Sequence, residues 1–188
     1  MTELLNADFY SYESQNWYRF VMENYVPDQS RPLVFLPCAN ANKTRKIYGK
    51  KKISESMTHQ LLSVITKNDY FEKVIISEPL VIIPYSLEDH MPDYDYFPEL
   101  LHVLPYDCVL KDDWQLKRRL AIFLYHLAEI QPNRKTLYYI GGRHHYELLK
   151  SAIDIDNKFR LVYCIPPGGI KNYSRSAQEF VKKIKKEE

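Results

Sequence analysis

Paired cysteines and long apolar runs are absent from this 188-residue chain, and glycine is scarce. The three cysteines lie far apart and form no CxxC pair, which argues against a disulfide framework or a structural zinc site. No apolar run approaches the roughly 20 residues that span a membrane, and the N-terminus lacks a signal-peptide core. No cofactor or metal motif is visible. We therefore expect a cytoplasmic protein that binds neither metal nor cofactor.

A strong charge of either sign is also lacking, because the formal net charge is only +2. The basic residues are instead concentrated, with six cations in the ten positions 43–52 and further clusters at 117–119 and 182–186. A local basic cluster on a nearly neutral chain indicates a local anionic partner rather than general coating of nucleic acid.

Apolar runs alternate with segments of helical periodicity along the whole chain, which predicts a single α/β domain over residues 1–188. We expect a three-layer α/β/α sandwich around a mainly parallel sheet. The predicted strands are 33–37, 73–77, 80–83, 101–104, 136–140 and 159–165. The predicted helices are 9–25, 56–67, 111–130, 143–152 and 174–185. The acidic segment 86–99, rich in proline and tyrosine, is predicted to be a surface loop.

Four of the five glycines occur as two pairs, Gly141-Gly142 and Gly168-Gly169, each directly after a predicted strand. Ligands of open α/β sheets bind beyond the carboxyl ends of the strands, where glycine permits positive φ or a close approach of backbone to ligand. Cys38 and the basic loop 43–52 follow another strand and would lie at the same edge. Alternatively, each glycine pair only closes a tight turn.

Three residues near this edge are candidates for catalysis: Lys46, Cys38 and His59. Neighbouring cations lower the pKa of a lysine and so favour the neutral, nucleophilic amine, for which Lys43 is the alternative to Lys46. Cys38 could act as a thiolate in a cationic setting, or line a pocket as an inert thiol. His59 lies in the first turn of a predicted helix, where the dipole favours a neutral ring; it could serve catalysis or anchor the structure.

Other residues are candidates for binding. Tyr48 could stack on a base, Glu78 could accept hydrogen bonds from the N–H edge of a guanine-like base, and Gly141-Gly142 would border the pocket. Ser54 and Ser56 are candidate substrate contacts or helix caps. The cations predicted to contact an RNA backbone are Lys43, Arg45, Lys50, Lys51 and Lys52.

Several of these residues form a pattern that resembles the core domain of archaeosine synthase, an archaeal family that modifies tRNA. The first part of the pattern is Pro37-Cys38, then Lys46-Ile47-Tyr48, then Ser54, Ser56 and His59. The second is Ser77-Glu78-Pro79-Leu80, Pro84 and Leu87-Glu88, and Gly141-Gly142 is the third. The resemblance covers residues 31–165 and leaves a basic C-terminal helix and tail at 174–188. Residues 49–53 are an insertion relative to the pattern.

The resemblance implies a fold of the uracil-DNA-glycosylase type and a role in tRNA modification. Members of the family add lysine to the nitrile of 7-cyano-7-deazaguanine in tRNA, and they also carry transglycosylase-like and RNA-binding PUA domains. This chain resembles the core domain alone. We therefore expect a transferase that acts on a tRNA base. One alternative is a non-catalytic tRNA-binding subunit that partners a transglycosylase-like or PUA-containing protein. Another is a glycosylase-like protein that binds a nucleobase or nucleotide.

Overall fold

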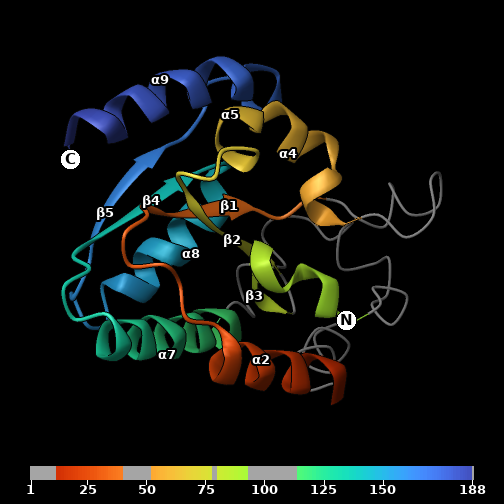
Figure 1. Cartoon of the computed structure of the whole chain (residues 1–188), viewed down its shortest axis with the longest axis vertical. Helices are drawn as coiled ribbons and strands as arrows, with labels where there is room; N and C mark the ends of the chain where they lie inside the picture. Colours follow the sequence, from red (N-terminus) through yellow and green to blue (C-terminus); the bar gives the residue numbers. More distant parts are fainter. Residues whose placement is uncertain (1–11, 40–51, 78–79, 93–113, 188) are drawn as a thin grey trace.

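A five-stranded sheet forms the centre of the chain in the computed structural model, which describes residues 12–39, 52–77, 80–92 and 114–187 (Figure 1). The strands are β1 (Leu33–Pro37), β2 (Glu72–Ser77), β3 (Val81–Pro84), β4 (Thr136–Ile140) and β5 (Arg160–Cys164). Their order across the sheet is β3-β2-β1-β4-β5. Among the helices of the described part, none combines the length and apolar character that spanning a bilayer requires.

All strand pairs except β2 with β3 are parallel. The chain passes from β1 to β2 on one side and later returns to place β4 on the other side of β1. The connections that leave β1 and β4 therefore diverge at their carboxyl ends. This divergence is the topological switch point at which open α/β sheets bind ligands.

Helices cover both faces of the sheet (Figure 1). One face carries α2 (Tyr12–Asn24), α7 (Trp114–Ile130) and α8 (Arg143–Ile153); the other carries α4 (Met57–Leu61), α5 (Ser63–Thr66) and α9 (Tyr173–Glu187). The three-layer α/β/α sandwich with a mainly parallel sheet is thereby confirmed.

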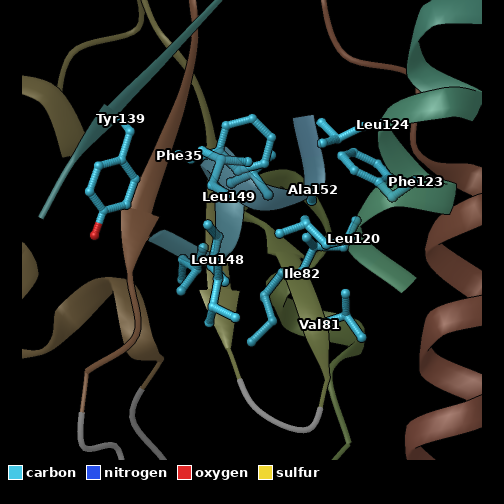
Figure 2. Close-up of a cluster of buried hydrophobic side chains, with 14 of the residues drawn as sticks. Phe35, Val81, Ile82, Leu120, Phe123, Leu124, Tyr139, Leu148, Leu149 and Ala152 are labelled. Atoms are coloured by element: carbon cyan, nitrogen blue, oxygen red, sulfur yellow. The ribbon is translucent and has the colours of Figure 1, made fainter. Parts of the chain in front are cut away.

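Alternating side chains of each strand supply the two cores. Phe35 and Tyr139 face α7 and α8, whereas Val34 and Tyr138 face α5 and α9. In Figure 2, aliphatic and aromatic side chains of β3, α7 and α8 pack together, with the hydroxyl of Tyr139 directed away from them. The central strand β1 is apolar throughout, because both of its faces are buried.

Two segments differ from the expectation. The predicted helix 56–67 is divided at Leu62, whose amide hydrogen-bonds with the carbonyls of both Thr58 and His59. Residues 86–90 of the predicted surface loop belong to the 3-10 helix η2 (Tyr85–His90), in which the buried Glu88 accepts hydrogen bonds from Ser54. The predictions for 93–99, 101–104 and 111–113 lie outside the described residues.

Gly141 lies where β1 and β4 end side by side. A Cβ atom at Gly141 would be 2.6 Å from the hydroxyl of Tyr139 and 2.9 Å from the ring of Pro37. The carboxyl ends of the two strands are therefore in van der Waals contact through this glycine. No larger residue fits there without moving β1 away from β4.

We predict that Gly141→Ala lowers the free energy of unfolding by about 1–3 kcal/mol, the usual range for overpacking. Urea denaturation followed by circular dichroism measures this loss. Gly142→Ala is the matched control, because its Cβ would meet its nearest neighbour, the Tyr173 hydroxyl, only at 3.8 Å. Equal losses in the two variants would contradict the contact described here.

Candidate functional site at the carboxyl edge of the sheet

Cys38 directly follows β1 and lies beside Ser77, the last residue of the neighbouring strand β2. The Sγ atom of Cys38 is 3.2 Å from Oγ of Ser77, within hydrogen-bonding distance. Ser77 is fully buried and Cys38 is half-buried. The parallel register of β1 and β2 brings these two side chains to one point of the edge. The Cys38 thiol can face a ligand at the carboxyl edge of the sheet, while the Ser77 hydroxyl orients the thiol.

The turn after β4 lies against the same point. The hydroxyl of Tyr139 donates a hydrogen bond to the carbonyl of Gly142 at 2.6 Å, and the amide of Gly141 donates to the carbonyl of Cys164 at 3.2 Å. Because Gly141 also contacts Pro37, the structure brings Cys38 and the first glycine pair together. The second pair follows β5, with φ of 70° at Gly168 and 73° at Gly169.

His59 connects three separate segments behind this edge. Its Nε2 lies 2.9 Å from the backbone carbonyl of Pro37, at the end of β1. Its Nδ1 forms a short hydrogen bond with the hydroxyl of Tyr85, the first residue of η2. The ring itself belongs to α4 and is fully buried. His59 thus ties α4 and η2 to the strand end from which the basic loop departs.

These partners determine the protonation of the ring. A carbonyl oxygen only accepts, so Nε2 carries the proton and donates to Pro37, and Nδ1 accepts from the Tyr85 hydroxyl. Burial lowers the pKa of His59 to about 4, and the hydrogen bond to Pro37 offsets only part of that effect. Burial, together with the charge of Glu88, raises the pKa of Tyr85, which keeps its hydroxyl a donor. The ring is therefore neutral at physiological pH.

A second set of contacts fixes the point at which the chain returns from the basic loop. Glu88 is buried and accepts two hydrogen bonds from Ser54, at 2.9 Å from the amide and 2.5 Å from the hydroxyl. Lys52 forms an ion pair of 2.6 Å with Asp89. Both contacts attach η1 (Ile53–Glu55) to η2, so this short helix holds the returning end of the loop.

The structure assigns local roles to several candidate residues. Ser56 is the N-cap of α4 and accepts a hydrogen bond from the amide of His59 at 3.4 Å. Ser54 is occupied by Glu88, and the Lys52 amine by Asp89. The remaining candidates lie outside the described residues: Lys43, Arg45, Lys46, Tyr48, Lys50, Lys51 and Glu78. The site is thus described at its base and at the two ends of the loop.

Tyr85, Ser77 and Glu88 belong to the site but are missing from the candidates predicted from the sequence. Ser77 and Glu88 do occur in the second part of the pattern described in the sequence analysis, and Tyr85 follows its Pro84. Their presence in that pattern is the signal that could have identified them. Their roles depend on contacts 26 to 39 positions away along the chain, which no local spacing reveals.

Chemically, the described residues provide hydrogen bonds and shape rather than a metal centre. Within the described ranges, no group of three His, Cys, Asp or Glu side chains is placed to hold a metal ion. Next to the glycine turn, Tyr163 on the edge strand β5 is 47% exposed and packs against Tyr146, with ring centroids 4.2 Å apart. This exposed ring offers a flat apolar surface at the same edge.

Comparison with known proteins identifies one family. Residues 14–159 match the family described as "Domain of unknown function (DUF5591)", which covers most of the chain. The chain therefore belongs to the DUF5591 family. The matched region runs from α2 to the residue before β5. It includes the site residues from Cys38 to Gly142 but not the second glycine pair, Gly168-Gly169. No curated protein and no solved structure matches the chain.

The neutral, buried His59 makes stability depend on pH. The unfolded chain binds a proton near pH 6.5, whereas the folded ring takes one only near pH 4. The unfolded state therefore binds more protons between these values, and the free energy of unfolding falls as the pH falls. We predict a contribution from His59 of about 2 kcal/mol between pH 7 and pH 5.

Urea denaturation of the wild type and of His59→Gln at both pH values measures this contribution. The variant should be less stable at pH 7 but should lose less stability on acidification. His90→Gln, which removes an exposed histidine, serves as the control and should follow the wild type. A pH dependence unchanged in His59→Gln would refute the assignment.

Proposed function

We propose that this protein modifies tRNA, by addition of an amine to the nitrile of 7-cyano-7-deazaguanine at the carboxyl edge of its sheet. The observation that carries the proposal is the contact of Pro37 with Gly141 at the switch point. Cys38 follows Pro37 there, and the chain leads from it into the basic loop 43–52. A pocket for a flat base and a loop for phosphates would then adjoin. The likeness of these segments to the archaeosine synthase core supports the same reading.

The proposed reaction is an addition, so it needs no leaving group and no redox partner. The amine nitrogen forms a bond to the nitrile carbon while one π bond of the C≡N group breaks. The nitrile nitrogen gains a proton and the attacking nitrogen loses one, which leaves an amidine. The amine belongs to free lysine, or to Lys46 or Lys43 of the chain, whose cationic neighbours favour the neutral form.

The residues of the edge would divide the remaining tasks. Cys38 and Gly141-Gly142 would border the base, and Glu78 would accept hydrogen bonds from its N–H edge. Cations of the 43–52 loop would contact phosphates. The bonds from Ser54 to Glu88 and from Lys52 to Asp89 support this arrangement, because they hold the returning end of the loop close to the sheet.

Incubation of the protein with tRNA that carries the cyano base, with and without free lysine, tests the proposal. Nuclease digestion and mass spectrometry should reveal an adduct of the base, and Lys46→Ala or Lys43→Ala should abolish it or reduce it at least about tenfold, a change of 1.4 kcal/mol. Lys182→Ala on the exposed side of α9 is the matched control and should retain the activity. No adduct beside an active archaeosine synthase would overturn the enzymatic proposal.

One observation favours a second function, that of a non-catalytic tRNA-binding subunit with a transglycosylase-like or PUA-containing partner. Both ring nitrogens of His59 are engaged within the fold, so the ring has no position left for proton transfer to a substrate. In that case the protein alone would produce no adduct. It would bind tRNA with an affinity that falls with salt and falls further when Lys50 and Lys51 are replaced.

A further inference from the structure

An apolar groove lies on the outer surface of α7, away from the carboxyl-edge site. It has a volume of about 460 Å³, and its walls come from α7 and from the turn that follows α8. The apolar side chains Trp114, Ile122, Tyr125 and Ile155 line it and are 52%, 45%, 52% and 60% exposed. The buried apolar side chains of α7 face the sheet, as Figure 2 shows for Leu120, Phe123 and Leu124.

This arrangement makes α7 apolar on two sides. A helix on the surface of a sandwich needs one apolar stripe for the core, and Leu116, Leu120 and Leu127 already supply it. Trp114, Ile122 and Tyr125 form a second stripe at helical spacing on the other side. Clustered exposed apolar side chains of this kind mark interaction surfaces.

The charge that borders the groove is positive. Lys117 and Arg118 line it, and neither has an ion pair within the described part of the chain. The acidic lining residue Asp156 is already paired with Lys158 at 3.3 Å. An occupant with carboxylates beside its apolar side chains would match these features.

We propose that this groove binds an acidic amphipathic helix of a partner protein. A helix laid in a groove presents apolar anchors at positions i, i+4 and i+7. One more anchor at i+11 gives the spacing between Trp114 and Tyr125 at the two ends of the stripe on α7. The aliphatic walls of Ile122 and Ile155 suit such anchors better than they suit the phosphates and sugars of an RNA strand. In a symmetric dimer the same patch would face itself, which would bring the cations of two copies together. The interaction is independent of the function proposed above.

Fluorescence of Trp114 provides the test. The chain has two tryptophans, and Trp17→Phe leaves Trp114 as the reporter. The probe is a synthetic helical peptide with a leucine stripe flanked by glutamates, and its counterpart carries lysine in place of each glutamate. We expect saturable binding of the acidic peptide with a blue shift of the emission, and at least about tenfold weaker binding of the basic peptide.

Two variants and one control then define the contact. Ile122→Asp should weaken binding at least about tenfold, and the double variant Lys117→Glu, Arg118→Glu should prefer the basic peptide. Lys182→Glu with Lys186→Glu on α9 makes the same change in net charge on the opposite face and should bind like the parent protein. Equal affinity for the two peptides, or no saturable binding, would overturn the proposal.

Two further outcomes would reassign the groove and so overturn the proposal as well. Sedimentation equilibrium would reveal a dimer that Ile122→Asp dissociates if a second copy is the occupant. Loss of tRNA binding in Ile122→Asp, with peptide binding unaffected by the charge reversal, would assign the surface to RNA.

Discussion

The buried imidazole of His59 holds the carboxyl end of β1 to α4 and η2, and the geometry of the candidate site depends on it. Its Nε2 donates to the last carbonyl of β1, and its Nδ1 accepts from Tyr85. Both bonds require the neutral tautomer with its proton on Nε2, because a protonated Nδ1 could no longer accept the hydrogen bond from Tyr85. Burial, which lowers the pKa to about 4, maintains that tautomer. The ring therefore acts as a structural bridge between the end of β1, α4 and η2.

Contact between β1 and β4 at Gly141 complements this bridge. On one side, Pro37 is held by His59 through its carbonyl; on the other, its ring touches the position where a Cβ of Gly141 would be. The end of β1 is thus held from both sides. Cys38, which lies beside Ser77, is the next residue of the chain. A basic loop that starts there and returns at the Ser54–Glu88 pair has both ends attached to rigid elements. The described residues on either side of the loop are therefore preorganised, which suits recognition of a fixed ligand.

Much of the fold could be predicted from the sequence, because local patterns determine it. The bounds predicted for the strands 33–37 and 136–140 are the bounds observed, since each is a short apolar run, the first preceded by Pro32 and the second followed by Gly141. The acidic composition of segment 86–99, rich in proline and tyrosine, predicts a surface loop, yet the burial of Glu88 depends on Ser54, which is 34 positions away. The partners of His59, Pro37 and Tyr85, are also far from it along the chain. The sequence pattern therefore identifies His59 as a candidate residue but could not predict its two hydrogen bonds.

The protonation state of His59 tests the account most directly. Long-range ¹H–¹⁵N correlation spectra of the uniformly labelled protein, with the ring assigned through His59→Gln, report the tautomer and its titration. We predict a neutral ring with the proton on Nε2 that persists from pH 7 to near pH 4. A proton on Nδ1, or titration close to the ordinary value of about 6.5, would contradict the bridge on which the site is built.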